Sequence, residues 1–549
     1  MLTKFFGSGA IAGACLMIAS TQAQAGALPE RVVQAVNASI ADGRYQTVVF
    51  GLIDGDQSAV QTFGKLDNGK APDGDTVYEI GSITKTFTAT MLAQEVLSKH
   101  VTLETPVSKL LPDFTIPSRA GKPITLGNIG TQRSGLPRMP ANFSPKDSAN
   151  PYADYDAAML RAFLAGYNLP RDPGASYEYS NLAFGLLGYA LAQTSHTTYG
   201  NLVARQVLRP LGMAMSGTSF TDVMRAHLAP GHDENGKPAS NWDLDALAGA
   251  GAVRSTANDM LRYLKANMGM GHSPLQTAMK FAQQPRADIG NGTRIGLAWM
   301  TTGKGVVWHN GGTGGYRSFI AFTADGRHGV VVLTNTAAEV DDLGFAVLDP
   351  SAPLTAARKA VTLPAASLDA YVGTYKLSDN FFVKFFRVGD TLMTQATGQG
   401  AFQVFPSAPD EFFAKIAPIT ITFQRNAKGE VSGLVLHQNG DDVAPKLNAA
   451  EIPPEPKQIA LDPATLHDYV GKYQFPFGAV LDVTLSGEQL AAQLSRQPSV
   501  PIYPSAKDEF FYKIVDARLS YERDAAGKVV AVVLHQNGQD MRAPRVSER

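Results

Sequence analysis

Cysteine is nearly absent from this chain of 549 residues, because the single one, Cys15, lies close to its start. The remainder of the chain therefore has no thiol for a disulfide or for a cysteine-based metal site. A charge excess of either sign is also missing, since 48 lysines and arginines almost cancel 49 acidic residues. This balance argues against nucleic acid or an anionic membrane as a partner and favours small or neutral ones. It leaves the oligomeric state open.

Long apolar runs are also missing, except at the N-terminus. There Lys4 precedes an apolar run over residues 5–19, and small residues flank Gln24 just before position 26. This order predicts a secretory signal peptide in residues 1–25, cut after Ala25. A membrane anchor is the alternative, but the run is shorter than the roughly 20 residues that span a bilayer. We therefore expect no integral membrane span and a mature protein that is periplasmic or secreted.

Strand and helix patterns alternate in the first half of the chain. Residues 47–66 and 318–335 each read as two strands joined by a turn, at Asp54-Gly55 and Asp325-Gly326. Apolar residues at helical spacing lie between these hairpins, in residues 86–99, 183–193 and 257–268. The pattern predicts an α+β domain over residues 26–348, with an antiparallel sheet that both chain ends close and helices flank.

From about residue 349 the sequence becomes strand-like and is duplicated. LDAYVGTYKL, from Leu368, returns as LHDYVGKYQF, from Leu466, and FPSAPDEFFAKI returns as YPSAKDEFFYKI. Each pair is 98 residues apart, and a proline-rich linker precedes each copy. The duplication predicts two small all-β barrel domains, at residues 366–450 and 464–549.

Three histidines stand close to Asn-Gly pairs, namely His232, His437 and His535. Asn-Gly is the strongest short signal for a hairpin turn, so we interpret these histidines as neighbours of surface turns. No second ligand cluster with metal spacing accompanies them. We predict neither a metal nor a cofactor.

Three short motifs follow one another along the first domain. GSITK contains Ser82 and Lys85, YSN spans Tyr179 to Asn181, and HNG begins at His309. A Ser-x-x-Lys match arises by chance roughly once or twice in a chain of this length, so each motif alone is weak. Ser82 and Lys85 alone could equally be polar residues at a helix end.

In this order, the motifs resemble the active-site set of the serine β-lactamase and penicillin-binding superfamily. The branch that the chain resembles contains class C β-lactamases, D-alanyl-D-alanine carboxypeptidases, D-aminopeptidases and related esterases, whose middle motif is Tyr-x-Asn. The linking segments TQRSGLPR, RPLGM, GAGAVRSTANDM and IGLAW are similar to that family's in sequence order. The resemblance covers about residues 30 to 340 and implies a β-lactamase-like fold. The C-terminal repeats resemble the lipocalin-like appendages of some family peptidases.

Helix geometry supports a reactive serine. Residues three apart share a helix face, so Lys85 can reach Ser82, and burial would lower the pKa of the lysine and make it a general base. Ser82 also stands at a helix N-terminus, where free N–H groups favour a developing oxyanion.

The family resemblance implies the remaining roles. Tyr179 would carry the proton between Ser82 and the leaving group, and Asn181 would hold Lys85 and the substrate carbonyl. His309 would line the pocket, Gly311 would bring the backbone close to the substrate, and the Gly312 N–H would be the second oxyanion donor.

Histidine at position 309 replaces the lysine of β-lactamases, and a neutral or partly charged imidazole grips a carboxylate less firmly. We therefore expect an exported serine peptidase or amidase that acts on small peptides through an acyl-enzyme on Ser82. Its substrates would be those of a D-aminopeptidase or carboxypeptidase, or linearised cyclic peptides. One alternative is a carboxylesterase or β-lactamase with the same residues. Another is a non-catalytic protein that binds penicillin or another ligand.

Overall fold

The computed structural model describes residues 26–143, 145–234, 236–355, 360–378, 381–397, 401–414, 419–438, 441–452, 458–475, 479–494, 500–512, 517–536 and 539–546. The predicted signal peptide with Cys15, Asn235, the two Asn-Gly pairs of the repeats and the linker residues 356–359 and 453–457 lie outside these ranges. None of the helices within these ranges is long and apolar enough to cross a membrane.

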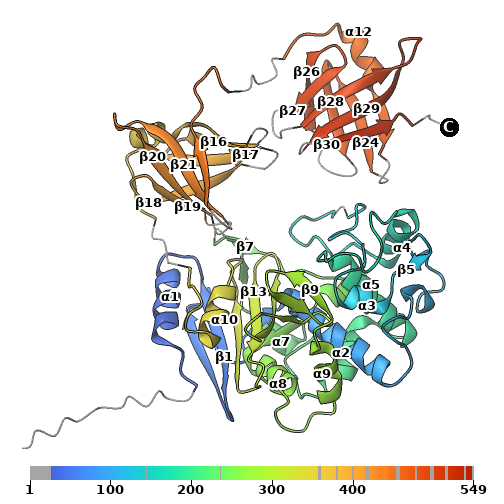
Figure 1. The fold of residues 1–549 in the computed structure, drawn as a ribbon, viewed down its shortest axis with the longest axis vertical. Coiled ribbons are helices and arrows are strands. Elements are labelled where there is room, and N and C mark those ends of the chain that lie inside the picture. Colours follow the sequence, from blue (N-terminus) through green and yellow to red (C-terminus); the bar gives the residue numbers. More distant parts are fainter. Residues whose placement is uncertain are drawn as a thin grey trace, which may run out of the picture.

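An eight-stranded antiparallel sheet forms the centre of the first domain (Figure 1). Its spatial order is β2-β1-β14-β13-β12-β11-β10-β9. The strands are β1 (Thr47–Asp54), β2 (Gln57–Gly64), β9 (Ala287–Gly290), β10 (Thr293–Ile295), β11 (Met300–Thr301), β12 (Val307–Gly312), β13 (Arg317–Phe322) and β14 (His328–Thr334). The hairpin β1-β2 pairs with β14, so both predicted hairpins and the closure of the sheet by distant segments are confirmed.

Helices cover both faces of this sheet. They are α1 (Glu30–Ala41), α2 (Thr84–Leu97), α3 (Leu126–Gly130), α4 (Ala157–Gly166), α5 (Asn181–Thr194), α6 (Tyr199–Val203), α7 (Asp222–Ala226), α8 (Ala257–Asn267), α9 (Gln276–Gln283) and α10 (Asp341–Leu348). The three predicted helices are confirmed as α2, α5 and α8, and α2 begins two residues earlier than expected. Short two-stranded sheets complete the domain: β3 (Val77–Glu79) with β8 (Arg254–Thr256), β4 (Ser118–Arg119) with β5 (Lys122–Pro123), and β6 (Gly231–His232) with β7 (Pro238–Ala239).

Alternate residues of the central strands enter two separate cores. Val48 and Phe50 of β1 pack in the core that α1 and α10 cover. Val49 and Ile53 pack on the opposite face, in the core that contains α2, α5 and α8. Successive side chains of a strand point to opposite faces, so the near-continuous apolar run of β1 reflects burial on both sides.

Two eight-stranded antiparallel sheets follow, each curled into a nearly closed barrel (Figure 1). The first contains β15 (Gly373–Ser378), β16 (Phe381–Val388), β17 (Thr391–Ala396), β18 (Phe402–Ala408), β19 (Glu411–Ala414), β20 (Thr420–Arg425), β21 (Val431–His437) and β22 (Asp441–Pro445). The second contains β23 (Gly471–Gln474), β24 (Val480–Ser486), β25 (Gln489–Leu494), β26 (Val500–Ala506), β27 (Glu509–Tyr512), β28 (Ala517–Arg523), β29 (Val529–Gln536) and β30 (Gln539–Pro544). A short helix precedes each sheet, α11 (Ala365–Leu368) and α12 (Pro463–Leu466). The predicted pair of all-β units is thus confirmed.

Aromatic side chains fill both barrels in the same way. Tyr371 and Phe412 of the first copy lie with ring centroids 4.7 Å apart at 70°, and Tyr469 and Phe510 of the second copy repeat both values. The duplication is therefore structural as well as sequential.

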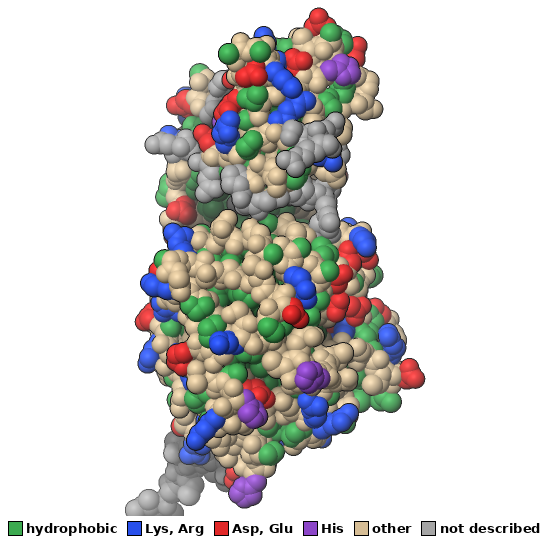
Figure 2. Space-filling view, turned by 90° about the vertical axis from the view of Figure 1, so that its right-hand side faces the viewer, with side chains coloured by type: hydrophobic (Ala, Val, Ile, Leu, Met, Phe, Trp, Pro, Cys, Tyr) green, Lys and Arg blue, Asp and Glu red, His purple; other side chains and the backbone are tan. Residues whose placement is uncertain are grey.

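The repeated histidines lie at strand ends, as the sequence predicts. His437 pairs with Asp441 across the ladder at 2.6 Å, and His535 pairs with Asp540 at 2.7 Å. Within the described residues, no group of three or more histidine, cysteine or acidic side chains is arranged to hold a metal ion. Figure 2 shows basic and acidic side chains interspersed over one face of the molecule, which agrees with the near-zero net charge.

Candidate active site

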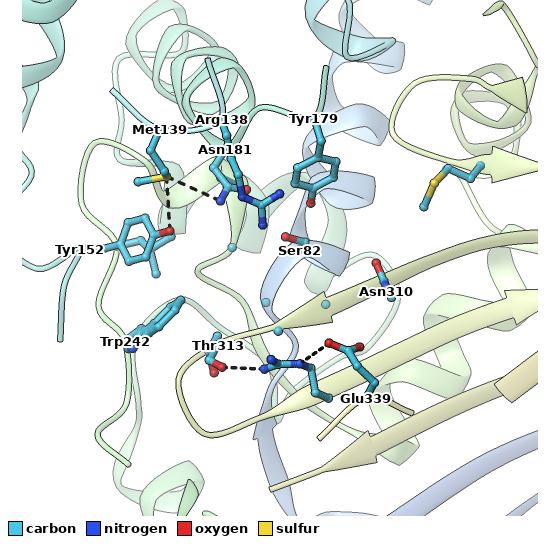
Figure 3. A pocket seen from close by; sticks show the side chains of 18 of the residues that line it. Ser82, Arg138, Met139, Tyr152, Tyr179, Asn181, Trp242, Asn310, Thr313 and Glu339 are labelled. Carbon is cyan, nitrogen blue, oxygen red and sulfur yellow. Dashed lines mark hydrogen bonds and ion pairs between the residues drawn. The ribbon is translucent and has the colours of Figure 1, made fainter. Parts of the chain in front are cut away.

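A cleft of about 520 Å³ opens between the end of β12, the start of α2 and the start of α5 (Figure 3). Such a volume suits a small ligand. The lining residues include Ser82, Arg138, Met139, Tyr152, Tyr177, Tyr179, Asn181, Trp242, Ala250, Trp308, Asn310, Gly311, Gly312, Thr313, Arg317 and Glu339. Three of the predicted motifs, far apart in sequence, therefore meet at one cleft.

Ser82 and Lys85 stand at the beginning of α2. Ser82 lies in a short 3-10 turn, Gly81–Ile83, that leads directly into the helix, and Lys85 is the second residue of α2. Lys85 Nζ is 2.9 Å from Ser82 Oγ, as the spacing of three residues predicts. The Lys85 side chain is fully buried, whereas Ser82 is partly open to the cleft.

Two further acceptors hold the Lys85 amine. Its Nζ lies 2.8 Å from Asn181 Oδ1 and 2.7 Å from the carbonyl oxygen of Ala250. A neutral amine has two N–H donors and one lone pair, so it can donate to these two oxygens and accept the Ser82 O–H. The three partners thus fit a neutral lysine that is directed at the serine proton.

The electrostatic environment favours the same protonation state. Burial lowers the pKa of Lys85 well below its ordinary value, and the nearby positive charge of Arg138 lowers it further. All three hydrogen-bond partners of the amine are uncharged groups. These surroundings therefore favour the neutral amine over the ammonium.

Tyr179 and Asn181 face the cleft because the residue between them is extended. Ser180 has φ −130° and ψ 112°, is buried, and caps α5 by accepting a hydrogen bond from the Ala183 N–H at 2.9 Å. In extended backbone the residues on either side of Ser180 project to the same side. The spacing of the Tyr-x-Asn motif is thus explained by a buried cap with a cleft-facing residue before and after it.

Tyr179 points its hydroxyl at Ser82 (Figure 3). Burial raises the pKa of Tyr179 above its ordinary value, while its hydrogen bond with Ser82 and the charge of Arg138 act in the opposite direction. Lys85 Nζ lies 4.8 Å from the centre of the Tyr179 ring. The phenol is therefore neutral and lies beside both the serine and the amine.

The HNG segment forms an open edge of the sheet. β11 pairs with β12 at Val307 and Trp308, and this pairing does not continue along the part of β12 that follows Trp308. Asn310 lines the cleft, whereas His309 is 1% exposed and is not among the lining residues. Burial, together with the charge of Lys85, lowers the pKa of His309 to about 3, although its Nδ1 hydrogen-bonds to the Asn310 carbonyl at 2.6 Å. The imidazole is therefore neutral, and the predicted role of His309 in substrate binding stays a prediction.

Glycines allow β12 to approach Ser82 closely. A Cβ atom on Gly311 would overlap the Ile80 carbonyl oxygen and lie 2.9 Å from Ser82 N. A Cβ on Gly81, which has a φ of +46°, would lie 2.6 Å from Gly312 N. The backbone nitrogens of Ser82 and Gly312 are thus brought to the same end of the cleft.

Ala250 and Arg138 also border the site, although the sequence alone predicts no role for either of them. The Ala250 carbonyl gives no side-chain signal in a sequence. Arg138 Cζ lies 5.2 Å from the centre of the Tyr179 ring, and its guanidinium points into the cleft (Figure 3).

Comparison with known families gives two matches. A family described as "Beta-lactamase" matches residues 30–347, and a "Domain of unknown function (DUF3471)" matches residues 357–452 and 455–545. The second match corresponds to the two barrel-like sheets.

Individual relatives match the first domain. The chain is 31% identical over 307 residues to the D-alanyl-D-alanine-carboxypeptidase/endopeptidase AmpH of Escherichia coli strain K12, covering 51% of this chain and 77% of that protein. It is 27% identical over 300 residues to a Beta-lactamase of Pseudomonas fluorescens, covering 48% of this chain and 80% of that protein.

Solved structures agree in fold. The D-alanine carboxypeptidase AmpC from Burkholderia cenocepacia is 25% identical with a TM-score of 0.50, covering 58% of this chain and 97% of that one. A Beta-Lactamase/D-Alanine Carboxypeptidase from Pseudomonas syringae has a TM-score of 0.52 at 21% identity, covering 59% of this chain and 98% of that one. The α+β fold expected from the sequence is confirmed.

Proposed function

Because this chain belongs to the Beta-lactamase family and is a serine hydrolase of that family, we propose that it cleaves small peptides through an acyl-enzyme on Ser82. Its substrates would be those of a D-aminopeptidase or a carboxypeptidase, or linearised cyclic peptides. The observation that carries the proposal is the 2.9 Å contact between Ser82 Oγ and a fully buried Lys85 amine. Two oxygens that can only accept hydrogen bonds occupy the other positions around that amine.

In the proposed first step, neutral Lys85 removes the Ser82 proton while Oγ attacks the substrate carbonyl. The carbonyl π electrons move to its oxygen, which becomes an oxyanion. The backbone N–H groups of Ser82 and Gly312 would stabilise it, since their nitrogens lie together at one end of the cleft. The start of α2 adds a favourable partial positive charge there.

The tetrahedral intermediate then collapses. The oxyanion re-forms the carbonyl, the bond to the leaving amine breaks, and the amine nitrogen takes a proton from Tyr179 Oη. Tyr179 recovers that proton from Lys85, whose ring contact of 4.8 Å places the two groups side by side. A water molecule next attacks the acyl-enzyme, its proton returns through the same groups, and Ser82 is released with the acid product.

The neutral state of His309 distinguishes this site from that of β-lactamases, for which the sequence resemblance implies a lysine at that position. With a pKa of about 3, its imidazole offers no positive charge to a substrate carboxylate at neutral pH. A carboxylesterase or β-lactamase that uses the same residues is the alternative function. This alternative is supported by the shared active-site residues and by the similarity to the Pseudomonas fluorescens protein.

Export is part of the proposal and rests on the pattern of residues 1–25. N-terminal sequencing of protein from the medium or periplasm should begin at Gly26. Protein that keeps its first residues and stays inside the cell would contradict export without affecting the chemistry.

The activity test compares the full chain with Ser82→Ala. A fluorophosphonate should label the native enzyme and not the variant, and short D- and L-peptides should be cleaved only by the native enzyme. Rapid nitrocefin or p-nitrophenyl ester turnover without peptide cleavage would replace the peptidase assignment with the alternative. Penicillin binding without any Ser82-dependent hydrolysis would indicate a non-catalytic binding protein.

A further inference from the structure

Three charged side chains line the cleft: Arg138, Arg317 and Glu339. Two of them, Arg317 and Glu339, form a pair. Arg317 Nε donates to Glu339 Oε1 at 3.0 Å, and its Nη1 donates to the Thr313 carbonyl at 2.9 Å. Arg138 has neither a side-chain hydrogen bond nor an ion pair within the described part of the chain. Among the described residues, the cleft therefore contains one positive charge, that of Arg138, without an acidic partner.

The backbone of Arg138 is held firmly to the Tyr-x-Asn segment. Its carbonyl accepts hydrogen bonds from the Asn181 N–H at 3.0 Å and the Leu182 N–H at 3.3 Å. Ser180 Oγ donates to the carbonyl of Pro137 at 2.6 Å. The loop that carries the arginine is thus tied to the segment that carries Tyr179, and the exposed Arg138 side chain lies against the Tyr179 ring, close to Ser82 (Figure 3).

Its contact with Tyr179 leaves the donors of the guanidinium free. A guanidinium packed against an aromatic ring keeps its N–H groups available for a planar oxyanion partner such as a carboxylate. The pKa values of the other basic groups near the serine, Lys85 and His309, are both lowered, which favours their neutral forms. Arg138 is therefore the group in the cleft that is suited to hold an anion.

We propose that Arg138 is a specificity-determining residue that binds a carboxylate of the substrate. The inference rests on the proposed function and narrows its substrates to peptides with a free carboxylate near the scissile bond. A protonated amine at the same place would be repelled, which disfavours peptides with a basic side chain there. The carboxylate could belong to the acyl part or to the leaving part of the substrate.

The experiment uses two matched substrate pairs, one for each position. The p-nitrophenyl monoester of adipic acid carries a carboxylate on its acyl part, and p-nitrophenyl hexanoate does not. N-acetyl-D-alanyl-D-alanine carries a carboxylate on its leaving part, and its C-terminal amide does not. The measured quantity is the ratio of kcat/KM for the charged member to that for the neutral member.

In Arg138→Gln this ratio should fall roughly 10- to 100-fold for one of the two pairs, the expected loss of a charge-assisted hydrogen-bonded contact. Arg138→Lys should restore part of the ratio, because the charge returns without the planar pair of donors. Arg161→Gln is the matched control, since Arg161 also lies over an aromatic ring, that of Phe114, but outside the cleft. It should leave both ratios unchanged.

Unchanged ratios for both pairs in Arg138→Gln would overturn the inference and leave the proposed function intact. Absence of any Ser82-dependent hydrolysis would instead contradict the proposed function. Calorimetry with Ser82→Ala then tests Arg138 independently of turnover. Monomethyl adipate should bind more tightly than dimethyl adipate, and the added Arg138→Gln change should abolish the difference. Equal binding of the two esters would overturn the inference.

Discussion

Asp341 is a half-buried residue whose carboxyl group contacts Asn310 of the cleft, and its replacement by asparagine should stabilise the first domain increasingly as the pH rises. Asp341 is the first residue of α10, and its Oδ2 accepts a hydrogen bond from Asn310 Nδ2 at 2.6 Å. Its Oδ1 is buried and has no hydrogen-bond partner within the described residues. Burial, together with the charges of Glu339 and Asp342, raises the pKa of Asp341 from 3.8 to about 7, although the Asn310 hydrogen bond and the charge of Arg317 act in the opposite direction.

The sign of the effect follows from this raised pKa. The unfolded chain releases the Asp341 proton near pH 4, whereas the folded chain holds it until about pH 7. Stability that is present below pH 4 is therefore lost as the pH rises toward 7. At about 1.36 kcal/mol per pH unit, the loss reaches about 1.6 kcal/mol at pH 5 and about 4 kcal/mol above pH 7.

Asp341→Asn avoids this loss because an amide does not ionise, and it keeps an oxygen that can accept from Asn310. Relaxation around a buried charge reduces such values, so we expect the variant to gain about 1–3 kcal/mol between pH 5 and pH 9. Urea unfolding, followed by tryptophan emission, measures this gain in the free energy of unfolding. The chain has 3 tryptophans, and Trp242, Trp299 and Trp308 all lie in the first domain, so the barrels do not contribute.

The control is Asp56→Asn, which removes the same charge from an exposed turn between β1 and β2. Its effect on the unfolding midpoint should be small at both pH values. An Asp341→Asn gain that is equal at pH 5 and pH 9, or a loss at both, would refute the reasoning. Since Asn310 lines the cleft, the same variant should also change the pH dependence of kcat/KM between pH 6 and pH 8.

Two further substitutions test the site itself. Gly311→Ala should lower kcat about 100-fold or more, because its Cβ would overlap the Ile80 carbonyl and displace β12 from Ser82, and loss of one oxyanion donor alone has about that effect. Gly303→Ala, where the nearest atom is 3.5 Å from the added Cβ, should keep native rates, and similar rates for both variants would contradict the assignment. Lys85→Arg should lower the rate of p-nitrophenyl ester hydrolysis by about 10²–10⁴-fold from pH 6 to pH 10, because a guanidinium stays charged and cannot act as the base. A variant that keeps more than a tenth of the native rate would exclude Lys85 as the base.

Much of the fold follows from local signals, and the exceptions have physical causes. The turns at Asp54-Gly55 and Asp325-Gly326 marked the two hairpins, and the 98-residue repeat marked the barrels. Strands β9 to β11 have only two to four residues each, too few for an alternating pattern to appear. Helix α2 begins earlier than predicted because the two polar residues at its start are buried and have internal partners, as when the Val253 N–H donates to Thr84 Oγ1 at 3.0 Å.

The site was predictable where it depends on sequence spacing. Ser82 and Lys85 share a helix face, and Tyr179 and Asn181 share one side of an extended segment, so the sequence indicates both pairs. Which side chains of β12 border the cleft was not predictable in this way. Adjacent strand residues point to opposite sides, and the sequence does not reveal which side borders the cleft. The structure places Asn310 among the lining residues and His309 in a buried position.

The charge of Arg138 also connects the parts of the proposed mechanism. Before the reaction it lowers the pKa of Lys85 and so favours the neutral amine that serves as the base. Once Lys85 has taken the serine proton, two positive charges lie close to the Tyr179 ring, because Lys85 Nζ is 4.8 Å and Arg138 Cζ is 5.2 Å from its centre. Their repulsion favours passage of the proton through Tyr179 to the leaving amine, and the same charge lowers the pKa of the phenol that must release it. A substrate carboxylate bound to Arg138 would weaken both effects, so turnover of such substrates depends on how far that carboxylate lies from Lys85. Arg138 therefore couples substrate choice to proton transfer, and its replacement should alter the pH profile of hydrolysis even for neutral substrates.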